Sequence, residues 1–314
     1  MFRFIANRIL MVLPTVVIVS ITVFALIRFI PGDPAALMLG DTAEPQQIAA
    51  MRAELGLDQS MPVQFLVWAE RALSGDLGRS ITTGEPVLHL VISKFFISAQ
   101  IVLVAVLLAS LIAVPAGVIA AWRQNSVTDL ALVGTATVLL SIPTFWLGLL
   151  LLLFFGLKLG WLPVLGYVSI SDDLGAGLLY LMLPVMTLVI HECGVLIRMA
   201  RAATLEVLRL DYITHARAKG LTEAAVLWKH AFKNSFGPTW TMIGLILGNH
   251  LGGIAVIETV FSIPGLGRLM VDAIFQRDYP VIQGCLLLVA LSYVVVNLLV
   301  DLLYPIFDPR VVAE

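Results

Sequence analysis

Long apolar runs constrain this chain more than any other feature of its sequence. A helix of about 20 apolar residues is long enough to cross the hydrocarbon core of a bilayer. Composition agrees with such spans, because 60% of the residues are hydrophobic and 13% are charged, against about 25% charged residues in a soluble domain. The sequence therefore predicts an all-α membrane protein with six transmembrane helices. The apolar runs lie at 9–30, 96–122, 131–157, 178–199, 240–262 and 282–304.

Charge distribution predicts how these spans are oriented. Residues 1–30 are expected to form a retained anchor, because the apolar run after Arg8 is longer than that of a signal peptide and no small-x-small cleavage site closes it. Six spans place both termini on one side. Lys and Arg favour the short segments on that side, so both termini are predicted to be cytoplasmic. A net charge of −2 without a basic block gives no indication of nucleic-acid binding.

The segment 31–95, between the first two runs, is predicted to be an extracytoplasmic loop. It opens with Pro31-Gly-Asp-Pro34, which ends the first span and turns the chain. Apolar residues at helical spacing predict one short helix over 45–55 and a second after Pro62. Two interpretations fit this pattern: a lid packed on the outer ends of the spans, and a surface that receives a soluble partner. The sequence does not separate them.

The region 200–238 is a charged island in an otherwise apolar chain. Asp211 is expected to be the N-cap of a helix over 212–219. Lys219 lies in the last turn of that helix, where the helix dipole favours a cation. Gly220 suits the left-handed position just past the end. Thr222 is then expected to cap a second helix, which ends before residue 239.

The first of these helices has only two turns, and so short a helix has little stability alone because nucleation is costly. It therefore needs packing from the chain's own spans and from a partner. Tyr212, Ile213 and Ala216 offer an apolar side, while other side chains offer donors to carboxylates or carbonyls across an interface. Those donors are His215, Arg217 and Lys219. The alternative is a positive cytoplasmic loop with ordinary helix caps.

The run Ala216-Arg-Ala-Lys-Gly220, with His230 and Asn234 after it, resembles the EAA loop of ATP-binding-cassette importer permeases, in the form used by the dipeptide, oligopeptide and nickel branch. Aligned on its glycine, the family's Glu-Ala-Ala falls at Thr214-His215-Ala216, so the literal Glu223-Ala-Ala225 is interpreted as a coincidence. Further motifs resemble that branch in identity and order. They are Pro31-Gly-Asp-Pro34, Leu55-Gly-Leu-Asp58, Gly75-Asp-Leu-Gly78 with Ser80, Trp161-Leu-Pro163, Pro264-Gly-Leu-Gly267, Arg277-Asp-Tyr-Pro-Val-Ile-Gln283 and Asp308-Pro-Arg310.

This resemblance implies a type I importer transmembrane domain over 96–305, with a coupling loop at 200–238 and a cytoplasmic tail at 306–314. It also implies that the short helix is a coupling helix, which enters a groove of a separate ATPase subunit. The coupling residues would be Tyr212, Ile213, His215, Ala216, Arg217, Ala218, Lys219, Gly220 and Leu221.

The resemblance further implies a set of partners: a second, homologous permease, two ATPase subunits and a soluble substrate-binding protein. The chain has no G-x-x-x-x-G-K-[ST] sequence, so it is not expected to hydrolyse ATP. No cofactor is expected on this chain, because ATP and Mg²⁺ would bind the ATPase subunits. The implied location is the bacterial inner membrane.

The cargo implied by the resemblance is a di- or oligopeptide, with nickel, glutathione or short oligosaccharides as alternatives. A function of another class, a membrane-embedded hydrolase, would need a nucleophile and a base on facing spans. Ser141, Ser292 and His191 are the available groups, and neither serine lies in a G-x-S-x-G context.

Gly244, Gly248 and Gly252 repeat at four-residue spacing along the fifth run. Small residues on one helix face let helices approach closely in lipid, where packing must supply the attraction. These glycines therefore predict a packing seam, within the chain or against the partner permease. The alternative is local flexibility or a kink.

Ionisable residues inside spans are costly and indicate function by default. His191, Glu192, His250 and Glu258 are therefore candidate pore-lining residues, with structural hydrogen bonds as the alternative. Adjacent residues such as His191 and Glu192 point about 100° apart on a helix and cannot both face one narrow pore. Cys193 is expected to be a small buried hydrophobe. The sequence predicts no metal site.

The segment 264–279, after the fifth run, predicts one more short helix. Apolar residues recur at helical spacing from Leu266 to Ile274, while Arg268 and Asp272 lie on the other side. This pattern is typical of an interfacial helix, which would pack near the outer ends of the spans.

Overall fold

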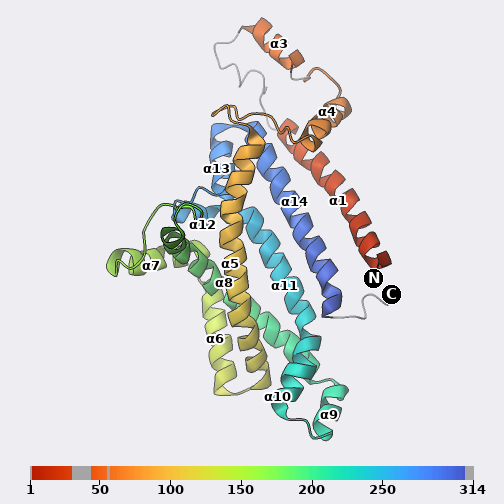
Figure 1. Cartoon of the computed structure of the whole chain (residues 1–314), viewed down its shortest axis with the longest axis vertical. Helices are drawn as coiled ribbons and strands as arrows, with labels where there is room; N and C mark the ends of the chain where they lie inside the picture. The colour runs from red at the N-terminus through yellow and green to blue at the C-terminus, as the bar shows by residue number, and fades with distance from the viewer. Residues whose placement is uncertain (1, 30–43, 55–56, 308–314) are drawn as a thin grey trace.

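The chain forms an elongated bundle of helices (Figure 1). The computed structural model describes residues 2–29, 44–54 and 57–307. Within these ranges every regular element is a helix, and one isolated β-bridge joins Arg79 to Pro86. The motif at 31–34, part of the one at 55–58 and the tail at 308–314 lie outside the described residues.

Four helices in the described part of the chain are long and apolar enough to cross a membrane, and a bent pair would make a fifth span. These four helices are α1 (Phe2–Phe29), α5 (Val87–Trp122), α8 (Leu174–Leu208) and α14 (Tyr279–Leu303). α11 (Phe232–Gly253) holds most of the fifth predicted run but does not reach the same hydropathy. The count of six spans stays a prediction.

The third predicted run, 131–157, is broken in the middle and is not one continuous helix. It is divided between α6 (Val127–Ser141) and α7 (Thr144–Leu151), which continues as the π-helical η1 (Leu152–Lys158). The two parts are bent by 97°. Pro143 explains the break, because proline has no N–H to donate and pushes the preceding residue out of the helical region.

The fifth predicted run, 240–262, and the helix before it also differ from expectation. α10 (Glu223–Ala225) and the π-helical η2 (Val226–Ala231) pass directly into α11, so the second helix of the island does not end near Pro238. Pro238 lies inside α11, where packing against α8 and α14 outweighs one lost backbone hydrogen bond. The apolar run then breaks at Ile254, before α12 (Ala255–Val260).

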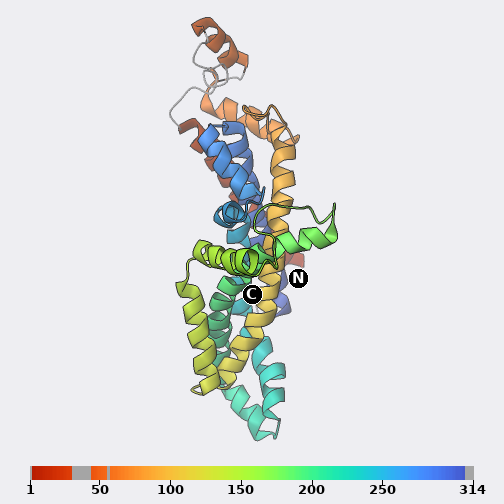
Figure 2. The same ribbon diagram turned by 90° about the vertical axis from the view of Figure 1, so that its left-hand side faces the viewer.

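The core of the bundle lies where α5 packs against α8 (Figures 1 and 2). Gly117 of α5 permits this contact, because a Cβ there would lie 2.6 Å from the Ile197 carbonyl oxygen and 2.7 Å from the Ala200 Cβ. α6 and α11 add further walls against α8. α1 lies apart from this core and packs against α14. Only 11% of the apolar stretch of α1 is buried.

Two short helices, α3 (Pro45–Glu54) and α4 (Met61–Leu73), occupy the segment between α1 and α5, as predicted. The turn that follows α4 is tied to the start of α14. Asp278 accepts hydrogen bonds from the Ser80 hydroxyl and from the Thr82 hydroxyl, the latter at 2.9 Å. Its other carboxylate oxygen caps α14 through the backbone N–H of Val281.

The predicted interfacial helix is present as α13 (Leu266–Gln276). Leu266 and Ala273 are buried, whereas Arg268 and Asp272 form an exposed pair on the opposite side, 3.9 Å apart. The prediction of an amphipathic helix in this segment is therefore confirmed.

The glycines at 244, 248 and 252 face α14 of the same chain. A Cβ on Gly248 would lie 2.8 Å from the Tyr293 Cδ2, and one on Gly252 would lie 2.8 Å from the Val289 Cγ1. At Gly244 the obstructing side chain is Val300. The three glycines thus lie on a seam between α11 and α14, and this seam is filled from within the chain, not by a partner permease.

We expect Gly248→Ala to lower the stability of the purified chain by about 1–3 kcal/mol, because the added methyl group overpacks the contact with Tyr293. Thermal unfolding measures this change. Gly134→Ala is the matched control, since a Cβ at Gly134 meets no atom within 4 Å and alanine is the better helix former. Equal unfolding temperatures for both variants would contradict the seam.

Candidate coupling site

The short helix of the charged island is α9 (Asp211–Ala218). Its N-cap is Leu210, which makes no side-chain cap, and Asp211 is the first helical residue. The prediction of Asp211 as the N-cap is therefore off by one position, although the dipole still favours an acid in the first turn. Lys219 is the C-cap, and Gly220 follows with φ +79°, the left-handed conformation expected there.

α9 is fixed to the bundle by a small apolar core of its own. Ile213 is fully buried and Ala216 nearly so. Around them lie Val118 of α5, Val207 of α8, and Val226, Leu227 and Ala231 of η2. Thr222 caps the next helix, as predicted, by accepting from the Ala225 N–H. α9 is thus attached by apolar packing to one end of both central helices.

An ion pair closes the turn between α9 and α10. The Arg217 guanidinium donates to both carboxylate oxygens of Glu223, at 2.9 and 3.2 Å. These bonds lower the pKa of the Glu223 carboxyl, so the pair stays charged at neutral pH. Sequence reasoning set Glu223 aside as coincidental; its i+6 spacing from Arg217 across Gly220 was the available signal. Arg217 is engaged within the chain and is not a free donor.

The predicted coupling residues therefore divide into two groups. Ile213 and Ala216 are buried and anchor the helix to the bundle. The other predicted coupling residues are exposed, and together they form what we call the outer face of α9. Within that face Tyr212 is held in place, because its hydroxyl accepts from the Asn234 amide at 3.1 Å. The exposed residues without a side-chain bond among those described are His215, Ala218, Lys219 and Leu221.

A second ion pair supports this end of the bundle. Arg201 of α8 donates to both oxygens of the buried Asp129 carboxylate of α6, at 2.6 and 2.8 Å. Asp129 also accepts from the Asn125 N–H, and its own N–H donates to the Ser126 cap. This pair was not predicted, although Ser126-Val-Thr-Asp129 carries the [ST]-x-x-[DE] capping pattern that marks the start of α6.

Among the candidate pore residues, the structure brings Glu192 and His250 together. The Glu192 Oε1 and His250 Nε2 lie 2.6 Å apart and join α8 to α11, with Glu192 3% exposed. The buried Nδ1 of the neighbouring His191 has no hydrogen-bond partner among the described residues. Cys193 faces α5, where its thiol approaches the Ala109 carbonyl. The described residues include no group of three potential metal ligands.

Glu258 lies at 0% exposure and therefore faces no open cavity in this conformation. Its carboxylate accepts from the Ser98 hydroxyl and from the Arg268 N–H, the latter at 2.7 Å. Ser98 in turn accepts from the Leu266 N–H at 2.8 Å. Glu258 thus satisfies the N-terminus of α13 and joins it to α5 and α12, which is a structural role.

The groups considered for hydrolysis are not assembled. The Ser141 and Ser292 hydroxyls both donate to carbonyls of their own helices, those of Thr137 and Leu288. Neither serine has a histidine partner among the described residues.

Comparison with known protein families gives a match along nearly the whole chain. The family described as "Binding-protein-dependent transport system inner membrane component" matches residues 113–313, and its N-terminal counterpart matches residues 1–103. The chain belongs to this family. It is therefore a permease, the membrane-embedded component of a transport system.

Relatives of this permease match at full length. It is 42% identical to a probable peptide ABC transporter permease of Sinorhizobium fredii, with 98% of each chain covered. It is 40% identical to the di/tripeptide transport system permease of Pseudomonas aeruginosa and 39% identical to a glutathione transport system permease of Escherichia coli, each with 99% of both chains covered.

Solved structures confirm the predicted type I importer fold. The permease superposes on a chain of the methionine ABC transporter in an inward-facing conformation with a TM-score of 0.57. The match covers 70% of this chain and 97% of that one, at 16% identity. At that identity the likeness concerns the fold alone.

Proposed function

We propose that this permease imports di- and oligopeptides, which a soluble binding protein delivers and which ATP hydrolysis on separate subunits drives across the membrane. The observation that carries the coupling role is the geometry of α9. Two buried residues, Ile213 and Ala216, fix this helix to the bundle, while His215 and Lys219 on its exposed face make no side-chain bond to any described residue. A displacement of α9 by a partner would therefore act directly on α5 and α8, against which it packs.

The remaining assignments follow from this placement. α9 lies at one end of the bundle, and α4 lies at the opposite end (Figure 1). If α9 faces ATPase subunits in the cytoplasm, then the segment 31–95 faces the outside, where a binding protein would dock. Both termini would be cytoplasmic, ATP and Mg²⁺ would bind the two ATPase subunits, and a second permease would complete the pathway. The division into an anchor at 1–30 and a transport domain at 96–305 rests on the same proposal.

Peptides are the proposed cargo because full-length relatives are named as peptide permeases. Glutathione is the second candidate, favoured by the relative at 39% identity. It is itself a tripeptide, so the two cargoes share an amide backbone and free carboxylates.

We expect the complete transporter, reconstituted in proteoliposomes with its binding protein outside, to accumulate a labelled dipeptide only when ATP is supplied to the ATPase subunits. Uptake of labelled glutathione in the same vesicles tests the second candidate, and omission of the binding protein is the control. If neither compound accumulates but another loaded binding protein stimulates the ATPase activity, the proposed cargo is wrong. The role as an importer permease would then still stand.

A further inference from the structure

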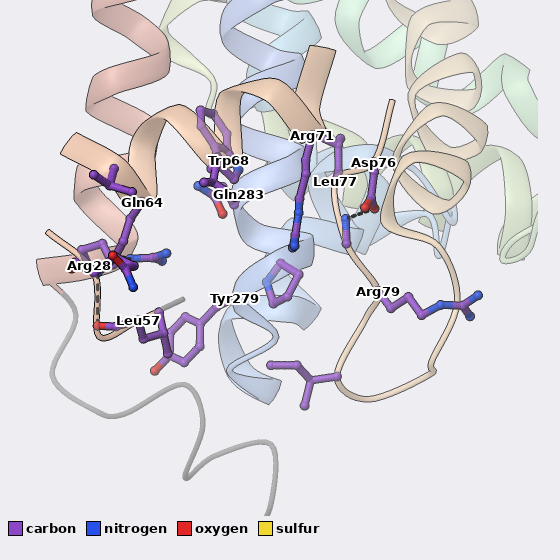
Figure 3. Close-up of a pocket in the computed structure, with 16 residues that line it drawn as sticks. Arg28, Leu57, Gln64, Trp68, Arg71, Asp76, Leu77, Arg79, Tyr279 and Gln283 are labelled. Atoms are coloured by element: carbon purple, nitrogen blue, oxygen red, sulfur yellow. Dashed lines mark hydrogen bonds between the residues drawn. The ribbon is translucent and has the colours of Figure 1, made fainter. Parts of the chain in front are cut away.

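A cavity of about 270 Å³ lies at the end of the bundle opposite α9 (Figure 3). α1, α4, the turn after α4 and the first turn of α14 enclose it. Trp68 and Tyr279 provide aromatic walls, and Gln64 and Gln283 provide amides. No assigned function uses this cavity.

The cavity carries an excess of positive charge. Arg28, Arg71 and Arg79 line it, and Asp76 is the acidic residue among the described lining residues. The Asp76 carboxylate is already engaged, since it accepts from the Gly78 N–H at 2.9 Å. Figure 3 shows Arg71 extending into the cavity, and Arg71 makes no ion pair with any described residue.

The donors in this cavity are held in place but are not saturated. The Arg28 Nε donates to the Gln64 Oε1 at 3.0 Å, and its guanidinium lies 4.7 Å from the Phe24 ring centroid. These contacts orient the group and leave its terminal nitrogens for a ligand. The Gln283 Nε2 lies in the wall as a buried donor with no acceptor among the described residues. Guanidinium groups arranged in this way suit a phosphate, which accepts paired hydrogen bonds.

The surroundings of the cavity are those of a membrane interface. Arg28 lies in the last turn of α1, a helix that the bundle leaves largely uncovered. α4 has no buried residue, and it exposes Leu66 at 65% and Leu73 at 91%. The rings of Phe24, Phe65 and Trp68 make edge-on and tilted contacts where the two helices meet. Aromatic and basic side chains at the end of a span, beside an exposed apolar face, are typical of the lipid headgroup level.

We propose that this cavity binds the phosphate headgroup of an anionic phospholipid, between Arg28 and Arg71, with the acyl chains along the exposed faces of α1 and α4. The bound lipid would hold α4 against the end of α1. This site is separate from the coupling site, and the proposal does not depend on which cargo the permease carries.

The test is a thermal-shift titration of the full-length chain, purified and delipidated in a zwitterionic detergent. The probes are dihexanoyl-phosphatidylglycerol, dihexanoyl-phosphatidylcholine and inorganic phosphate. We expect the phosphatidylglycerol to stabilise the chain and the other two to have little effect. Arg71→Gln should weaken its apparent Kd by about tenfold, because one charge-assisted hydrogen-bond partner is lost. Arg71 is exposed, so the substitution leaves packing intact.

Lys158→Gln is the matched control, since it removes an exposed cation outside the cavity and should leave the Kd unchanged. The double variant Arg28→Gln/Arg71→Gln should abolish the response. An unchanged affinity in both arginine variants, or equal stabilisation by phosphatidylcholine, would overturn the proposal. Stabilisation by inorganic phosphate as strong as that by phosphatidylglycerol would also overturn it, in favour of a site for small anions.

Discussion

Replacement of Gly220 by proline is expected to abolish ATP-driven uptake while the permease still folds and inserts. Gly220 has φ +79°, a value that proline cannot adopt because its ring holds φ near −65°. Its N–H also donates to the Arg217 carbonyl at 2.9 Å, a hydrogen bond that proline cannot make. Both losses fall on the turn that orients the outer face of α9. Uptake by proteoliposomes and ATPase activity of the complete transporter measure the effect.

Gly160 provides a matched control for this experiment. It too has a positive φ, +64°, and a Cβ at either glycine would meet no atom within 4 Å. The backbone strain of Gly160→Ala and Gly220→Ala should therefore be similar, on the order of 1–2 kcal/mol. We expect Gly220→Ala to reduce uptake far more than Gly160→Ala. Equal losses would mean that strain, and not the position of α9, explains the defect.

The features of α9 that the sequence predicted are local ones. A short helix, a left-handed glycine at its end and a threonine cap after it each depend on a few neighbouring residues, and each is present. Asp211 was misplaced by one position because Leu210 serves as the N-cap through its backbone alone. Side-chain preference gives no signal for a cap of that kind.

Breaks within apolar runs were missed because hydropathy reports how apolar a segment is and not the direction of its helix axis. The bend at Pro143 lies in the middle of an unbroken apolar run, and the helix at Pro238 continues through a residue that commonly ends one. In both places the outcome depends on which neighbours pack against the helix. A proline in the sequence therefore does not by itself show whether a helix bends, ends or continues there.

Side-chain pairs between residues far apart in the sequence could not be predicted from the sequence alone. Glu192 and His250 were both selected as costly charges, yet 58 residues separate them and only the fold places them in contact. The Asp129–Arg201 pair spans 72 residues. The glycines of α11 likewise predicted a seam, but nothing in their spacing names α14 as the helix that fills it.

Replacement of His250 by leucine is expected to destabilise the permease by about 3–5 kcal/mol, because it leaves the buried Glu192 carboxylate without its partner. His191→Leu is the matched control on the adjacent position. The buried Nδ1 of His191 has no acceptor or donor among the described residues, so its removal should cost little. Thermal unfolding of the purified chain compares the two variants.

The double variant Glu192→Met/His250→Leu distinguishes a structural pair from a pore lining. Apolar residues of similar volume can replace a buried polar pair at little net cost, so stability should return toward that of the wild type. Glu192 is 3% exposed and faces the α8–α11 contact, so we expect uptake to return with stability. A double variant that regains its unfolding temperature but not its uptake would instead show that the pair contributes to the translocation pathway itself.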